Sequence, residues 1–177
     1  MRAALDRLAQ LGYRRFAAFG LCSGAYHALQ AGLVEARFAT LLLVNLPWFT
    51  LRHDPPGPGS AARRALATLA QSATRTLFLF AAGDAGLRQF ERHFGPCRAA
   101  NGEADGDMPW AVTVGAGWDH DLTQAGMRQE AAGHLLRFLR RTAPGALPAP
   151  AASANPLSPP SFLPTSSLEV RAAAEYH

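Results

Sequence analysis

The sequence contains no lysine, although it has 17 basic residues, all of which are arginine. Without a lysine amine the chain cannot form a Schiff base, and it lacks the lysine with which a phosphate-binding loop contacts a nucleotide. The net charge is +4, but the arginines are scattered and the aromatic residues lie in apolar runs. Because no basic stripe is interleaved with aromatic residues, nucleic acid is not an expected partner.

Cysteines and long apolar runs are also scarce. The two cysteines, Cys22 and Cys97, are far apart and belong to no paired motif, which argues against a disulfide framework or a zinc site. We therefore expect neither a metal nor another cofactor. No apolar run reaches the ~18 residues of a membrane helix, and residues 1–10 have the pattern of an amphipathic helix rather than a signal peptide. A cytoplasmic protein without membrane contact is expected.

The 177 residues, 49% of them hydrophobic, are enough for one domain with a hydrophobic core. The composition changes at residue 142, where a segment rich in proline, alanine and serine begins. Such a segment buries too little apolar surface to offset the entropy of ordering it. We therefore expect a domain over residues 1–141 and a disordered tail over residues 142–177.

Helical and extended patterns alternate along the domain. Uncharged strands alternating with helices are typical of a parallel sheet covered on both faces. The sequence thus predicts an α/β fold with an open parallel four-stranded sheet flanked by helices. The carboxyl ends of the strands are expected to lie along one edge of this sheet. The expected strands are residues 15–21, 40–45, 76–81 and 110–115, and the expected helices are residues 2–11, 24–37, 61–71, 87–94 and 123–141.

The stretch FAAFGLCSG, residues 16–24, runs from an uncharged strand into a Gly-x-Cys-x-Gly turn that opens a helix. Such a turn holds its middle residue in a strained conformation, and both flanking glycines, Gly20 and Gly24, are expected to be crowded. The turn resembles the nucleophile elbow of the α/β-hydrolase superfamily, in the form that carries Cys. Dienelactone hydrolases and polyhydroxyalkanoate synthases have this form, and GLCSGAY is similar to serine-aminopeptidase-like hydrolases. The resemblance covers residues 1 to about 141.

The resemblance implies a catalytic triad of Cys22 as nucleophile, Asp84 as acid and His120 as base. Each follows the carboxyl end of a different predicted strand, in the chain order of an α/β-hydrolase triad. The alternatives are a buried structural thiol at Cys22 and an ordinary turn residue at Asp84. Ser23 is a less favoured nucleophile, because that register puts Leu21 where a small residue is needed.

The implied chemistry is acyl transfer through a thioester at Cys22, with a small-molecule ester, thioester or lactone as substrate. The backbone N–H of Ser23 would supply half of an oxyanion hole. Apolar side chains are expected to line the mouth of the site and to favour an apolar acyl or leaving group. These residues are Leu46, Trp48, Phe49 and Trp118.

The resemblance matches only the C-terminal half of an α/β-hydrolase, from the helix before the elbow strand onward. It therefore leaves out the N-terminal strands and the loop that carries the second oxyanion donor. Strand 16–20 would then be an exposed apolar sheet edge, where a second copy or a partner chain could associate. Three functions stay open: a hydrolase of ester or thioester bonds, an acyltransferase with the same triad, and a catalytically inactive binding or structural module.

Overall fold

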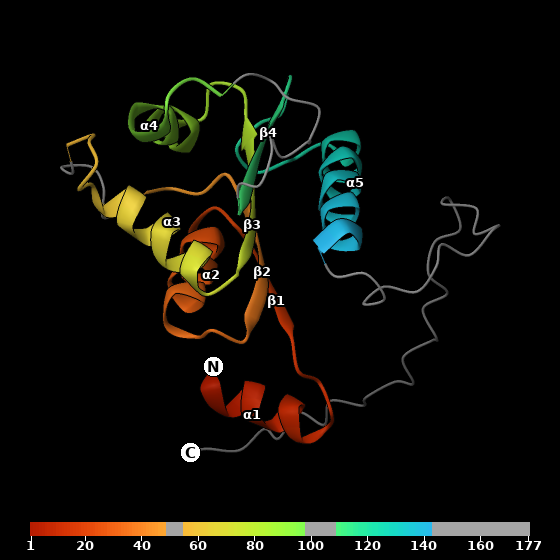
Figure 1. The fold of residues 1–177 in the computed structure, drawn as a ribbon. Coiled ribbons are helices and arrows are strands. Elements are labelled where there is room, and N and C mark those ends of the chain that lie inside the picture. The colour runs from red at the N-terminus through yellow and green to blue at the C-terminus, as the bar shows by residue number, and fades with distance from the viewer. Residues whose placement is uncertain (49–54, 98–108, 143–177) are drawn as a thin grey trace, which may run out of the picture. The chain divides into compact units, whose positions relative to one another are not determined.

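The computed structural model describes residues 1–48, 55–97 and 109–142, all within the unit Met1–Leu147. Helices and strands alternate through these residues, as the sequence pattern predicts (Figure 1). Among the described helices none is both long and apolar enough to cross a membrane. The elements are α1 (Arg2–Gln10), β1 (Phe16–Leu21), α2 (Ser23–Val34), β2 (Phe38–Val44), α3 (Ala61–Gln71), β3 (Arg75–Ala81), α4 (Ala85–Phe94), β4 (Trp110–Gly115) and α5 (Ala125–Thr142).

The strands form one parallel sheet in the order β1-β2-β3-β4, which confirms the predicted α/β fold and its four-stranded parallel sheet. Each strand therefore pairs with the next strand along the chain. At the carboxyl edge, Leu21 pairs with Val44, Val44 with Leu79, and Ala81 with Gly115. The loops that follow all of these strands thus leave the sheet on the same side.

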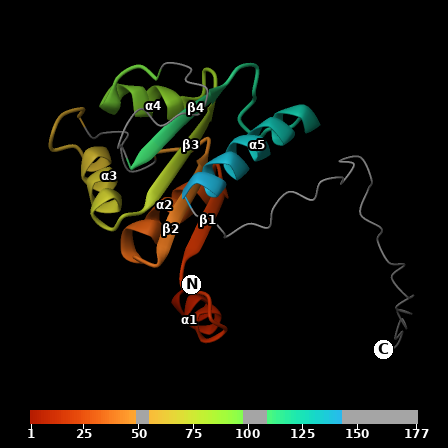
Figure 2. The same ribbon diagram turned by 45° about the vertical axis from the view of Figure 1, so that its right-hand side comes forward.

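The side chains of β2 and β3 alternate between two hydrophobic cores. Leu41, Leu43, Phe78 and Phe80 face the core that α2, α3 and α4 cover, whereas Leu42, Val44, Leu77 and Leu79 face the core under α5. This alternation follows from the two-residue period of a strand. Because the chain adds its strands in one direction, equal-handed crossovers place α2, α3 and α4 on the same face. Figure 2 shows α5 running across the other face.

The helix after the elbow ends earlier than the sequence pattern indicates. We expected it to reach about Arg37, but α2 ends at Val34, and Glu35 has an extended backbone (φ −140°, ψ 97°). Arg37 donates two hydrogen bonds of 2.8 Å to the Glu35 carboxylate and one of 2.7 Å to Asp6. These bonds hold Arg37 in the turn that follows Glu35, and the next strand begins at Phe38. The predicted tail lies outside the described residues apart from Thr142, the last residue of α5, so its disorder stays a prediction.

The turn between β1 and α2 has the strained geometry that the motif indicates. Cys22 has φ 53° and ψ −123°, a conformation that L-residues seldom adopt. A Cβ atom added to Gly20 would lie 2.2 Å from the backbone carbon and oxygen of Gly24. The crowding is one-sided, however, because a Cβ atom added to Gly24 would meet nothing within 4 Å. The expectation that both glycines must be small is therefore wrong for Gly24, whose Cβ direction points away from the strand.

We expect opposite effects from adding one methyl group at these two glycines. Gly20→Ala should lower the free energy of unfolding by about 3 kcal/mol or more, since the new atom meets backbone that cannot move aside. Gly24→Ala should raise it by up to about 1 kcal/mol, because alanine favours the helix and the space is open. Urea unfolding of both variants measures the difference. Equal stability of the two variants would contradict the one-sided crowding.

Candidate active site

The structure brings Cys22, Asp84 and His120 into one hydrogen-bonded row. The Nε2 atom of His120 lies 2.9 Å from the Cys22 sulfur, and its Nδ1 atom lies 2.6 Å from Oδ2 of Asp84. The first pair is separated by 98 positions along the chain and the second by 36. Three loops at the carboxyl edge of the sheet thus meet in a nucleophile, base and acid arrangement.

Cys22 is held at the junction of β1 and α2. Its N–H donates to the carbonyl of Val44 at 2.9 Å, which extends the β1–β2 ladder by one bond. Its carbonyl accepts from the N–H groups of Ala25 and Tyr26, which begin α2. The half-buried sulfur therefore lies at the N-terminus of a 12-residue helix, the positive end of its dipole. Within the described residues the N–H of Ser23 donates no hydrogen bond, so it is free to bind an oxyanion.

Asp84 is both the acid of the row and the N-cap of α4. Its Oδ1 atom accepts the N–H of Gly86 at 2.6 Å, and this bond orients Oδ2 toward His120. A Cβ atom on Gly86 would lie 2.2 Å from the carbonyl oxygen of Leu46, so glycine is needed for the helix to start here. The Asp84 side chain is only 6% exposed. Capping and burial together leave this carboxylate little freedom to turn away from the ring.

The partners of His120 favour its charged form. The hydrogen bond to Asp84, with a smaller contribution from the hydrogen bond to Cys22, raises the pKa of His120 from 6.5 to about 9. An imidazolium carries two N–H donors, so it can donate to the carboxylate and to the sulfur at the same time. The 41% exposed side chain also leaves the ring open to water.

The loop that carries His120 is braced by its own neighbours. Asp119 accepts from the backbone N–H groups of Asp121 and Thr123, both at 3.0 Å, and from the Thr123 hydroxyl. The hydroxyl and then the backbone N–H of Thr123 hold the pKa of Asp119 below its usual value. The indole N–H of Trp118 donates to Glu130 on α5 at 2.9 Å. Asp119 is thereby committed to its loop, and Asp84 is the carboxylate that contacts the imidazole.

Asn45 supports the site, although the sequence pattern marks it only as the last residue of a strand. It is fully buried with φ 47°, and its N–H donates to Leu79 at 2.8 Å. Its side-chain oxygen accepts the N–H of Ala81 at 2.7 Å, and its amide donates to the carbonyl of His120 at 2.6 Å. Asn45 thus connects the His120 loop to the ends of β2 and β3. The sequence signal that could have identified Asn45 is a polar residue at the end of an uncharged strand.

Three of the four residues expected to line the mouth of the site are buried. Leu46 and Trp48 are 0% and 3% exposed and pack in the core under α2, α3 and α4, where Trp48 stacks on Phe78 at 6.1 Å. Trp118 is 5% exposed and packs in the core under α5. Phe49 lies outside the described residues. The apolar side chains at strand ends were assigned to an open surface, but burying them yields more free energy than exposing them.

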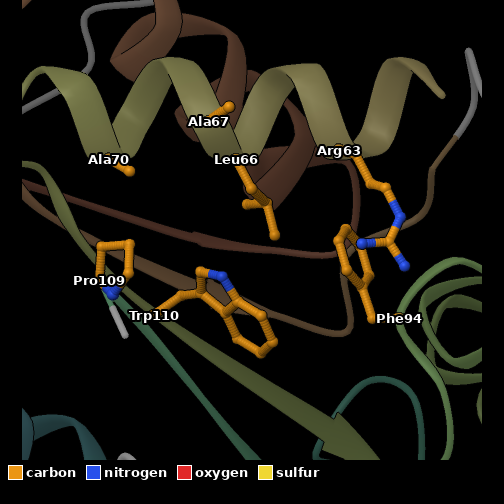
Figure 3. Close-up of a pocket in the computed structure, with 7 residues that line it drawn as sticks. All are labelled: Arg63, Leu66, Ala67, Ala70, Phe94, Pro109 and Trp110. Atoms are coloured by element: carbon orange, nitrogen blue, oxygen red, sulfur yellow. The ribbon is translucent and has the colours of Figure 1, made fainter. Parts of the chain in front are cut away.

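A cavity of about 250 Å³ lies away from the row, at the start of β4 (Figure 3). Leu66 and Arg63 of α3 point toward Trp110 and Phe94 there. This is the amino edge of the sheet, whereas Cys22 lies at the carboxyl edge. The described residues contain no cluster of three or more His, Cys, Asp or Glu side chains that could bind a metal ion.

Comparison with known proteins gave no match: no protein-family model, no curated protein and no solved structure is similar to this chain. The interpretation of the site therefore depends on its own residues and geometry.

The elevated pKa of His120 can be measured by NMR titration of its ring protons, assigned with a His120→Gln variant. We expect a midpoint near 9, and a shift toward 6.5 in Asp84→Asn, which retains the cap to Gly86 but not the charge. The folded pKa is above the unfolded one, so the stability gained should be complete below about pH 6.5 and lost as the pH rises through about 9. A wild-type midpoint near 6.5 would contradict the charged-ring geometry.

Asn45→Gly tests whether Asn45 positions His120, since glycine keeps the positive φ and removes the amide. Losing the buried hydrogen bonds of the Asn45 side chain should lower the free energy of unfolding by about 1–3 kcal/mol. The pKa of His120 should fall, and alkylation of Cys22 by iodoacetamide should slow severalfold. Thr74→Val is the control, because Thr74 is equally buried and donates to Phe38 at 2.9 Å at the opposite edge. If both variants alter His120 alike, Asn45 is merely structural.

Proposed function

We propose that this protein is a hydrolase that cleaves ester or thioester bonds through a covalent acyl-enzyme at Cys22. The observation that carries the proposal is the row Cys22–His120–Asp84, with contacts of 2.9 and 2.6 Å at the carboxyl edge of a parallel sheet. A sulfur at positive φ, at a helix N-terminus and beside an imidazole has the features of an activated nucleophile. The α/β-hydrolase resemblance of the GLCSG turn supports the same assignment.

The first half-reaction forms a thioester. His120 Nε2 holds the Cys22 proton, and the thiolate attacks the carbonyl carbon of the substrate. The N–H of Ser23 stabilises the developing oxyanion as one donor, and the N-terminus of α2 adds its dipole. As the tetrahedral intermediate collapses, the carbon–oxygen bond (carbon–sulfur in a thioester) breaks and His120 gives its proton to the leaving group. The acyl group is then bound to Cys22.

In the second half-reaction water replaces the thioester. His120 takes a proton from water, whose oxygen attacks the acyl carbon, and the proton returns to the Cys22 sulfur as the acid leaves. Asp84 keeps the ring oriented and favours its charged form. The 41% exposed His120 gives water access to the thioester, which favours hydrolysis over transfer to another acceptor. An acyltransferase would use the same thioester with an alcohol or amine in place of water.

The alternative is a catalytically inactive module that associates through β1. This strand is the edge of the sheet, and Phe19 on it is 60% exposed. An exposed apolar edge offers backbone hydrogen-bonding groups to a second copy or a partner chain. The two proposals differ in what they require of Cys22, and its reactivity separates them.

Mass spectrometry after incubation with p-nitrophenyl acetate tests the hydrolase. Cys22 should gain an acetyl group with release of p-nitrophenolate and then lose it to water. His120→Gln should slow this acylation by about 10²–10⁴-fold, the usual contribution of a general base. Cys97 is an internal control, because burial, with a smaller contribution from Glu91, raises its pKa to about 11. If Cys22 is acylated no faster than Cys97, the inactive-module alternative is favoured.

A further inference from the structure

An apolar cavity of about 230 Å³ lies on the face of the sheet that α5 covers. It is separate from the cavity beside Trp110, since the two share no lining residue. Its walls combine side chains of the first two strands with those of the last loop and helix. They include Phe19, Leu21, Val44, Leu122, Ala132 and Leu135.

Neither Cys22 nor His120 lines the cavity, but residues next to each of them in the sequence do. Leu21 directly precedes Cys22, and the carbonyl of Val44 accepts the Cys22 N–H at 2.9 Å. On the other side, Asp121 and Leu122 directly follow His120. Part of the wall is therefore built from residues next in sequence to the proposed nucleophile and base.

The topology explains why this space is left open. The crossover helices α2, α3 and α4 pack together on one face, and within the described residues α5 is the helix that covers the other. Toward β1 its cover is incomplete, since Phe19 is 60% exposed there. The cavity is thus open to a molecule that arrives from solvent.

The lining has the chemistry of a hydrocarbon site. Among the described lining residues only Asp121 and Arg128 are charged, and both are exposed, at the rim. Arg128 is engaged with the backbone, since it donates to the carbonyl of Leu122 at 2.9 Å and also to that of Thr123. A cavity with few polar partners holds water weakly.

The volume bounds the size of the group. A cavity of ~150 Å³ is large enough for benzene, so about 230 Å³ holds roughly six to nine carbon atoms. We propose that this cavity binds the acyl chain of the substrate, which makes the protein selective for acyl groups of medium length. The inference rests on the proposed hydrolase and adds its substrate class.

The test is a chain-length series of p-nitrophenyl acetate, butyrate, hexanoate and octanoate, with acylation of Cys22 followed by mass spectrometry. Burying methylene groups favours binding by up to about fourfold each, so the rate constant should rise from acetate to hexanoate. Ala132→Trp places an indole at an exposed lining position and should abolish this rise while leaving acetate unaffected. Gln129→Trp, an exposed position on the same helix outside the lining, is the matched control and should retain the rise.

Binding is measured separately in Cys22→Ala with octanoate, from NMR shifts of the methyl groups of Leu21, Leu122 and Leu135. We expect saturable shifts that Ala132→Trp removes. Acylation of Cys22 without a chain-length preference would overturn the acyl pocket and leave the hydrolase intact. Octanoate binding without any acylation would overturn the hydrolase, and with it the assignment of the bound chain as a substrate group. Equal loss of the rise in both tryptophan variants would also overturn the pocket.

Discussion

The close approach of two backbone segments, Gly20 at the end of β1 and Gly24 in the first turn of α2, underlies the geometry of the candidate site. With 2.2 Å between a hypothetical Gly20 Cβ and the Gly24 backbone, β1 and α2 can meet only without a side chain at residue 20. The chain then reverses within one residue, and Cys22 takes the strained conformation with φ 53°. In this conformation the Cys22 sulfur lies 2.9 Å from Nε2 of His120.

The second determinant is the order of the strands. Because all of the described strands are parallel, the loops that carry Cys22, Asp84 and His120 emerge along one edge of the sheet. Asp84 caps α4, and Cys22 is the N-cap of α2. The His120 loop is held by hydrogen bonds from Asn45 to the His120 carbonyl and from Trp118 to Glu130. The geometry of the candidate site therefore results from bonds that also stabilise the fold. This arrangement explains how side chains 98 positions apart can meet at hydrogen-bonding distance.

Much of this was predictable from sequence because the signals are local. The uncharged strands, the two-glycine turn and the polar residues after strand ends predicted the parallel sheet and placed Cys22, Asp84 and His120 at one edge. The predictions that were wrong concern features that depend on three-dimensional packing. Whether Trp48 and Trp118 are exposed is determined by which helices cover them, and the freedom at Gly24 depends on the direction of one Cα–Cβ bond. Asn45 was missed because its partners, Ala81 and His120, are remote in sequence.

The linear strand order also bears on how the protein is made. Each strand can dock on the one synthesised just before it, so the sheet can grow from β1 while the ribosome is still translating. The backbone around Cys22 is complete early, when α2 and β2 are in place, but His120 arrives only with the loop after β4. In a nascent chain Cys22 therefore has no histidine partner until β4 has paired. Reactivity at Cys22 would thus report the completion of folding.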